Sequence, residues 1–521
     1  MKPLTAGRKA CVTTALAITL TACHGAPKPA RPAPPVPPAL VALKHDLDAI
    51  LAAPALDRGY WGVLVKSLTT GETLYALNPR KLMMPASNMK IVTLAAAAER
   101  LGWDYRYETR ILGLGAIDFG SLDGDLIVVG SGDPSIVAAD GMADRLFASW
   151  AERLKSIGVR SINGRIIGDD NTFDDEPLGM GWSWDDLADG YAAGISALQF
   201  NEGQVRVTIG PGALEGDPAT IAIAPDGSGL RIRNMLKTSA PGTATSIAAR
   251  RFPGSTQLEL RGTVPLGSPP SVHTCSADNQ TQFFINALRN ALIANGIEVK
   301  GEAMDIDDVG DTPSKDEAIP FITYRSPPLS ELAGTLMKVS LNFDAETFLK
   351  TMGAVDGAPT FDGGRATARS ILQRWGVPAS GVIYADGSGL SRYNYITPDA
   401  LIAILTHVDR DETLRGPFKA SLPVTGKDGT LSNRMKGTAA DGNARAKTGS
   451  MANVRALSGY VTTADGEPLV FSILANNFET AADVVNRATD AIVVRLAQFR
   501  RVATETRSHG EEDSVWSSII P

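Results

Sequence analysis

One serine of this chain is followed three residues later by a lysine, and the pair could carry out nucleophilic chemistry. Ser-x-x-Lys occurs once, at Ser87 and Lys90, where Pro85 and a following apolar run predict the start of a helix. Residues three apart on a helix face the same side, with Cβ atoms about 5–6 Å apart. A serine hydroxyl needs a neighbouring base, and a lysine can be that base when burial or a second cation lowers its pKa. The pair therefore predicts a serine nucleophile with a lysine base.

Two further motifs follow along the chain and would complete a catalytic site. Ser340 and Asn342 form Ser-x-Asn after a predicted helix, and Lys447 begins a single Lys-Thr-Gly within a predicted strand. In this interpretation Ser340 relays a proton between Lys90 and the leaving amine, and Asn342 donates its amide to the substrate backbone. Lys447 is the second cation, and it would also bind a free carboxylate at the end of the substrate.

Backbone amides beside these residues could bind the oxyanion of such a reaction. The helix start at Ser87 offers one N–H, and Ser450 on the predicted strand offers a second. Each motif alone has a simpler explanation, because a serine at a helix start is usually an N-cap and a single lysine is usually a solvated charge. In this order and in these predicted contexts, the three motifs together resemble the signature of penicillin-binding proteins and class A β-lactamases.

Composition argues against several other classes of function. The 521 residues carry a net charge of −7, so nothing indicates binding to nucleic acid or to an anionic membrane surface. The five histidines are scattered and form no ligand pair, so we expect no metal site, and we expect no cofactor. Of the three cysteines, Cys275 alone lies in the body of the chain, where we expect a small buried hydrophobic residue and no intrachain disulfide framework.

The first residues have the layout of a secretory signal. A basic start precedes an uncharged run, residues 10–20, which is too short to span a membrane. The run leads into Leu-Thr-Ala-Cys, which resembles the lipobox of bacterial lipoproteins, so we expect a lipid on Cys23; ordinary cleavage without a lipid is the alternative. His24 follows where a retention signal would have Asp, which by resemblance favours the outer membrane. Residues 26–38 form a proline-rich spacer.

Longer strings extend the likeness to one family. They are LDGDL at residues 122–126, GSGDP at 130–134, DGSGLSR at 386–392 and LPVTGKDGTL at 422–431. With the three motifs, they resemble the class C low-molecular-mass penicillin-binding proteins, the D-alanyl-D-alanine carboxypeptidase/endopeptidase family. The likeness covers roughly residues 45–500, and the long gap between Ser87 and Ser340 is itself typical of that family, whose members carry extra domains there.

The resemblance implies an α+β fold, the penicillin-binding-protein/β-lactamase-like transpeptidase fold. In this fold an antiparallel sheet flanked by helices packs with an α-domain, and here it would carry a β-rich insertion of one or two modules. Alternating apolar residues with glycine and proline turns support the insertion. The expected divisions are a signal peptide with lipobox (1–23), a linker (24–40), a first transpeptidase-like part (41–107), the insertion (108–279), a second transpeptidase-like part (280–500) and a disordered tail (501–521).

The resemblance also assigns roles to the motif residues. It makes Ser87 the acylated nucleophile and Lys90 its base, while the Lys-Thr-Gly strand lines the far wall of the cleft. Asp386 and Ser388 match a recurrent string, but no chemical step follows from it, and a glycine-rich turn is an equally good explanation. The expected catalytic residues are Ser87, Lys90, Ser340, Asn342 and Lys447, and the expected substrate-binding residues are Thr448, Gly449 and Ser450.

The function implied is that of a serine-type D-Ala-D-Ala carboxypeptidase or DD-endopeptidase acting on peptidoglycan stem peptides and inhibited by β-lactams. We expect an exported, periplasmic protein that contacts the membrane only through an N-terminal lipid. A β-lactamase is one alternative, although no deacylating glutamate stands in a motif context. A catalytically inactive wall-binding lipoprotein is another, against which the intact motifs argue. The sequence leaves open the oligomeric state, the role of the insertion and the balance between carboxypeptidase and endopeptidase activity.

Overall fold

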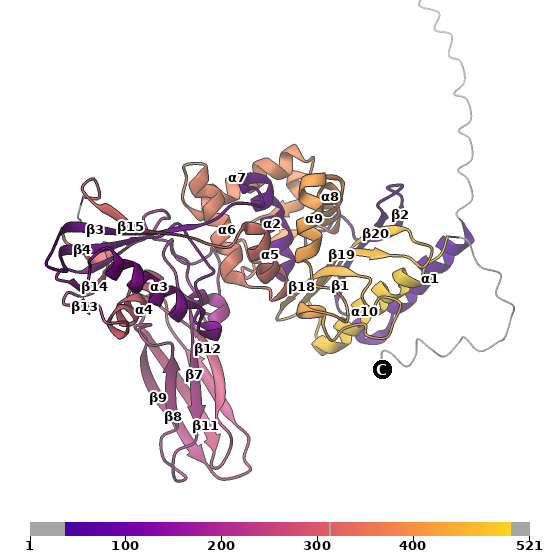
Figure 1. Cartoon of the computed structure of the whole chain (residues 1–521). Helices are drawn as coiled ribbons and strands as arrows, with labels where there is room; N and C mark the ends of the chain where they lie inside the picture. The colour runs from indigo at the N-terminus through magenta and orange to yellow at the C-terminus, as the bar shows by residue number, and fades with distance from the viewer. Residues whose placement is uncertain (1–36, 312–313, 502–521) are drawn as a thin grey trace, which may run out of the picture. The chain divides into compact units, whose positions relative to one another are not determined.

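The computed structural model describes residues 37–311 and 314–501 of the chain. Its five-stranded antiparallel sheet pairs the first strand of the chain with the last (Figure 1). Strand β1 (Tyr60–Ser67) pairs over its whole length with β20 (Pro468–Asn476). The order across the sheet is β18 (Arg445–Met451), β19 (Val454–Thr462), β20, β1 and β2 (Thr73–Leu77).

Both faces of this sheet are covered, which explains why its central strands β1 and β20 are largely apolar. Side chains alternate between the faces of a strand, so Val63 and Val65 pack into one core while Leu64 packs into another. The first core also contains α1 (Pro38–Leu51) and α10 (Ala482–Gln498), which lie together beside the sheet in Figure 1.

The second core is a cluster of helices around α2 (Met89–Leu101). Every residue from 89 to 98 is buried, as is typical of a helix that is apolar all round and enclosed by others. This cluster and the sheet form the predicted α+β architecture, and that prediction is confirmed. The surrounding helices are α5 (Leu329–Lys338), α6 (Asn342–Val355), α7 (Phe361–Arg374), α8 (Pro398–Arg410) and α9 (Glu412–Ser421).

A second set of sheets lies in the chain between α2 and α5, with its own hydrophobic core. Its largest sheet has seven strands, and two three-stranded sheets run in the orders β10-β11-β9 and β12-β7-β8. Helices α3 (Met142–Ser156) and α4 (Gln280–Ala294) pack into this core. The strands are β3 (Glu108–Asp118), β4 (Ser121–Val129), β5 (Ser161–Ile162), β6 (Ile166–Asp169), β7 (Gln204–Gly210), β8 (Thr220–Ala224), β9 (Arg231–Ser239), β10 (Ser246–Arg250), β11 (Gln257–Pro265), β12 (Ser271–Ser276), β13 (Glu298–Val299), β14 (Ala303–Asp305) and β15 (Ile319–Arg325).

The insertion extends further than the predicted boundary at residue 279. Phe283 and Leu288 of α4 belong to the inserted core, and β15 pairs with β3 so that Arg325 lies opposite Glu108. The prediction was wrong because helical spacing shows that α4 buries one face without showing which core receives it.

Two predicted boundaries at the ends of the chain also differ from the structure. Helix α1 begins at Pro38, inside the predicted linker, because proline fits the first turn of a helix. Arg501, placed in the predicted tail, forms ion pairs with Glu467 and Glu72. The predicted signal, Cys23 and most of the linker, like residues 502–521, lie outside the described residues.

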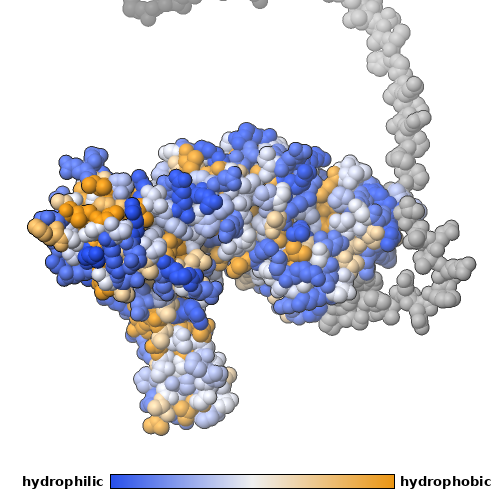
Figure 2. All heavy atoms as spheres, in the orientation of Figure 1, coloured by the Kyte–Doolittle hydropathy of each residue, from blue (hydrophilic) through white to orange (hydrophobic). Residues whose placement is uncertain are grey.

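The exposed surface on the face drawn in Figure 2 has scattered hydrophobic patches among hydrophilic residues. No helix within residues 37–311 and 314–501 has the length and apolar character needed to cross a membrane.

Candidate active site

Ser87 lies in a short 3₁₀ turn, Ala86–Asn88, that leads directly into α2. Ala86 has a φ of 46°, so the chain bends sharply just before the serine. No side-chain hydrogen bond caps this helix start, and the Ser87 hydroxyl instead accepts a hydrogen bond from the Lys90 Nζ at 3.0 Å. The predicted Ser-x-x-Lys pair is therefore in direct contact, and the N-cap explanation of Ser87 does not hold.

Lys90 is completely buried among oxygen atoms from three parts of the chain. Besides Ser87, its Nζ donates to Asn342 Oδ1 at 2.6 Å and to the Ser388 carbonyl at 2.9 Å. Burial lowers the pKa of Lys90 from 10.5 to about 8, although the negative charges of Glu346 and Asp386 raise it in part. A lysine with this pKa is neutral in an appreciable fraction of molecules near neutral pH, as a general base must be.

Lys447 and Ser340 form a second pair in the site. The Lys447 Nζ donates to the Ser340 hydroxyl at 2.8 Å and to the Thr448 carbonyl at 3.1 Å. Burial, and after it the charge of Lys90, lowers the pKa of Lys447 well below its ordinary value. Ser340 has a φ of 70°, so the turn that follows α5 presents its hydroxyl from a backbone conformation that serine rarely adopts.

Gly449 lets strand β18 approach the turn that carries Ser87. A Cβ atom on Gly449 would lie 2.6 Å from the Pro85 carbonyl oxygen and 3.3 Å from the Ala86 Cβ. Only glycine avoids this clash without a shift of the backbone. Within the described residues β18 is the edge strand of the sheet, so its outer amides near Gly449 are not used in the sheet ladder, and the predicted oxyanion donor Ser450 follows Gly449.

Asn342 connects the two sides of the site. Its Oδ1 accepts from Lys90, and its Nδ2 donates to the Tyr191 carbonyl at 2.9 Å. An amide nitrogen carries two hydrogens, so one remains for a substrate carbonyl, as the sequence suggested. The contact with Tyr191, a residue of the insertion, was not predicted.

Asp386, for which no chemical step was predicted, organises a loop beside Lys90. The carboxylate is fully buried and each of its oxygens accepts two hydrogen bonds, so its role in the structure is to fix the loop that presents the Ser388 carbonyl to Lys90. The donors are Trp182 Nε1 (2.8 Å), the Gly389 amide (2.8 Å), the Ser391 amide (2.6 Å) and Asn394 Nδ2 (2.6 Å).

Glu346 is a further residue of the site that sequence reasoning missed. It is fully buried on α6 and accepts hydrogen bonds from the amides of Gly387 and Ser388 at 2.8 and 2.7 Å. Burial, with the charge of Asp386, raises the pKa of Glu346 to about 8. A carboxylate within a helix that is buried on every side was the signal that could have identified it.

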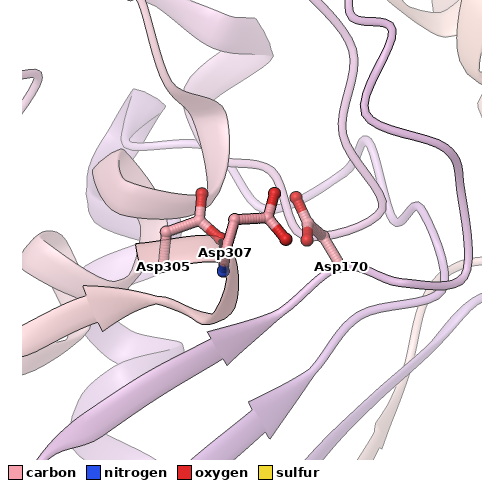
Figure 3. A group of neighbouring side chains, drawn as sticks. All are labelled: Asp170, Asp305 and Asp307. Atoms are coloured by element: carbon pink, nitrogen blue, oxygen red, sulfur yellow. Dashed lines mark hydrogen bonds between the residues drawn. The ribbon is translucent and has the colours of Figure 1, made fainter. Parts of the chain in front are cut away.

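Three carboxylates gather elsewhere, within the insertion. Oxygen atoms of Asp170, Asp305 and Asp307 lie within 4.8 Å of one another (Figure 3). Burial raises the pKa of Asp305 to about 6, and Asp170 Oδ2 accepts hydrogen bonds from Ser196 and Thr281 at 2.8 and 2.5 Å. Acidic groups of this kind are common without a metal, so we assign this cluster no role in the chemistry. The sequence did not suggest the grouping, because the residues come from separate segments.

The structure thus brings together all the predicted site residues that it describes, from the Ala86–Asn88 turn, α2, the turn after α5, the start of α6 and β18. A serine with a buried lysine partner on this fold is typical of the penicillin-recognising active-site-serine enzymes, which include peptidases and class A β-lactamases.

Comparison with known proteins identifies the family. The D-Ala-D-Ala carboxypeptidase 3 (S13) family model matches residues 43–499, and the chain belongs to this family. The D-alanyl-D-alanine carboxypeptidase of Actinomadura sp. (strain R39) is 36% identical over 473 residues, which are 88% of this chain and 85% of that protein. The crystal structure of penicillin-binding protein 4 (dacB) from Haemophilus influenzae has a TM-score of 0.73 and 25% identity, and the match covers 84% of this chain and 94% of that chain. The predictions of family and enzyme class are confirmed.

Proposed function

We propose that the protein cleaves D-Ala-D-Ala-type bonds of peptidoglycan stem peptides through an acyl-enzyme on Ser87, acting as a carboxypeptidase and DD-endopeptidase. The observation that carries this proposal is the contact between the Ser87 hydroxyl and the buried Lys90, whose pKa is lowered to about 8. Membership of the carboxypeptidase family supports the choice of substrate.

Acylation begins when neutral Lys90 takes the proton of the Ser87 hydroxyl as its oxygen attacks the carbonyl carbon of the scissile bond. The amides of Ser87 and Ser450 stabilise the oxyanion of the intermediate. The C–N bond then breaks, and Ser340 relays the proton that Lys90 took from Ser87 to the leaving amine, which leaves Lys90 neutral again. Water hydrolyses the resulting ester, which releases the shortened peptide and restores the serine.

Lys447 would couple binding of the substrate carboxylate to this chemistry. An anion beside Lys447 raises the pKa that burial has lowered, so a bound C-terminal carboxylate favours the charged form of Lys447. A charged Lys447 in turn disfavours a proton on Lys90, which leaves the base ready for Ser87. The Lys447–Ser340 hydrogen bond joins this cation to the proton relay.

The lifetime of the acyl-enzyme separates this function from a β-lactamase. With a peptide, the leaving D-alanine diffuses away and water reaches the ester; with a penicillin, the ring-opened amine stays attached and blocks that path. We expect a penicilloyl adduct that lasts minutes or longer, on a preparation that releases D-alanine catalytically from D-alanyl-D-alanine peptides. Both reactions are followed on one sample, by mass spectrometry and by a D-alanine assay. Many penicillins hydrolysed per second with no D-alanine released would identify a β-lactamase.

We also propose that the protein is exported and anchored to the outer membrane by a lipid on Cys23. The lipobox-like string at residues 20–23 and the proline-rich spacer after it support this proposal. Cys23→Ala is expected to prevent lipidation, and a form lacking the first 23 residues should be soluble and fully active. Mass analysis of the mature N-terminus measures the lipid directly, and a wild-type N-terminus without lipid would contradict the anchor.

A further inference from the structure

Residues 174–191, here called the wall segment, reach from the insertion to the active site. The segment consists of turns and bends, with one isolated β-bridge between Asp189 and Cys275, until the short η4 turn (Gly190–Ala192) at its end. It nevertheless touches the site at two points, because Trp182 donates to Asp386 and the Tyr191 carbonyl accepts from Asn342. A segment with so little regular structure depends on anchors outside itself to keep these groups in place.

Lys350 provides such an anchor at the beginning of the wall segment. Its side chain is completely buried, and its Nζ donates to the carbonyls of Asp174 and Glu176 at 3.0 and 2.6 Å. The same Nζ lies 2.6 Å from Asp174 Oδ1. These three oxygens all belong to the wall segment: the two carbonyls accept hydrogen bonds, and the Asp174 carboxylate forms an ion pair.

Aromatic rings complete the surroundings of this buried cation. The Lys350 Nζ lies 4.7 Å from the centre of the Phe361 ring and 5.7 Å from that of Phe173. Burial lowers the pKa of Lys350, and the ion pair with Asp174 opposes that shift. A desolvated lysine with this set of acceptors holds the wall segment in one position.

The helix that carries Lys350 also carries a residue of the active site. Asn342 is the first residue of α6, and Lys350 lies two turns further along the same helix. The two residues hold opposite ends of the wall segment, Lys350 near Asp174 and Asn342 at Tyr191. Because Asn342 also accepts from Lys90, a displaced wall segment would disturb the hydrogen bonds of the general base.

We propose that Lys350 is a positioning residue of the active site: it fixes the wall segment so that Trp182 and Tyr191 hold Asp386 and Asn342 in place around Lys90. The inference rests on the proposed chemistry at Ser87 and goes beyond it, since Lys350 touches neither Ser87 nor Lys90. It also gives the insertion a function, that of supplying one wall of the site.

The test compares Lys350→Met with Lys419→Met. Methionine keeps an unbranched apolar side chain but removes the cation. Lys419 is a matched control on α9, since it pairs with Asp409 and lies 4.4 Å from the centre of the Tyr460 ring, away from the wall segment. Acylation by a labelled penicillin, release of D-alanine and hydrogen exchange by mass spectrometry are measured on the full chain. We expect Lys350→Met to acylate about 10- to 100-fold more slowly, because small displacements in a preorganised site cost rates of this order.

Hydrogen exchange distinguishes positioning from a general loss of stability. In Lys350→Met, peptides from residues 174–191 should exchange faster while peptides from α2 and the five-stranded sheet exchange as in wild type, and Lys419→Met should match wild type in the wall segment and in acylation. Wild-type acylation by Lys350→Met, or slower acylation with unchanged exchange in the wall segment, would overturn the proposal. If Lys350→Met exchanges fast throughout the protein, Asp174→Ala is tested instead, because it removes the carboxylate partner of Lys350 and leaves its two backbone acceptors. The proposal is then judged by the acylation rate and the wall-segment exchange of Asp174→Ala. A wild type that is acylated but releases no D-alanine would contradict the proposed function alone, since acylation and exchange still test Lys350.

Discussion

Ser87→Ala is expected to abolish covalent labelling by penicillin and to lower D-alanine release at least about a thousandfold, because nucleophile and base act as a unit. Without the hydroxyl, Lys90 has no proton to take and no acyl-enzyme can form. The fold should be unchanged, since the side chain of Ser87 caps no helix. Loss of the hydroxyl removes one acceptor from Lys90, which still donates to Asn342 and to the Ser388 carbonyl.

Mass spectrometry of the intact protein and of its peptides after incubation with a labelled penicillin measures this effect. Ser458→Ala is a matched control, because Ser458 is a buried serine in the strand next to β18 and its hydroxyl bonds to Ser472. The control should label at residue 87 as wild type does. An adduct that maps to another residue, or that persists in Ser87→Ala, would refute the assignment of the nucleophile.

Lys447→Met is expected to lower carboxypeptidase kcat/KM about 100-fold, which corresponds to the loss of a charge-assisted contact of about 3 kcal/mol. The side chain lies in the interior, where methionine can replace its apolar stem but not its cation. The variant loses the group that would bind the substrate carboxylate, and Ser340 loses its hydrogen-bond donor.

The proposed contact between Lys447 and the substrate carboxylate can also be tested by changing the substrate. A peptide with an amidated C-terminus should be a poor carboxypeptidase substrate for wild type, and Lys447→Met should lose most of its preference for the free carboxylate. Initial rates of D-alanine or D-alaninamide release from the paired peptides measure this preference. Equal turnover of free and amidated ends by wild type would eliminate the proposed carboxylate contact.

The catalytic motifs could be predicted because they are local patterns with a direct physical meaning. A spacing of three on a helix brings Lys90 to the Ser87 hydroxyl whatever the rest of the fold does, and the structure has this contact at 3.0 Å. The strands of the central sheet were likewise predictable, since runs such as residues 469–475 are apolar and bounded by turn residues.

Long-range contacts could not be predicted from such patterns. Nothing near Tyr191 in the sequence indicates that its carbonyl meets Asn342, since the two residues are 151 positions apart. The same limit applies to Glu346 and Asp386. Their positions in the sequence are plain, but their effect on the pKa of Lys90 depends on a buried environment that only the folded chain creates. The boundary of the insertion was misplaced for a related reason, because the core that α4 joins is set by tertiary packing.

The paired strands at the base of the insertion bear on how the chain folds. Tyr107 and Ser326, whose backbones are hydrogen-bonded to each other, stand 219 positions apart at the junction where the chain leaves and re-enters the helical cluster. An insertion that folds as a unit thereby shortens the open loop between α2 and α5 to a few residues, and the entropy of closing that loop falls accordingly. Assembly of Ser87 with Ser340 then resembles closure of a short hairpin between helices. Substitutions that loosen the β3–β15 pair would slow this step while leaving every catalytic side chain unchanged.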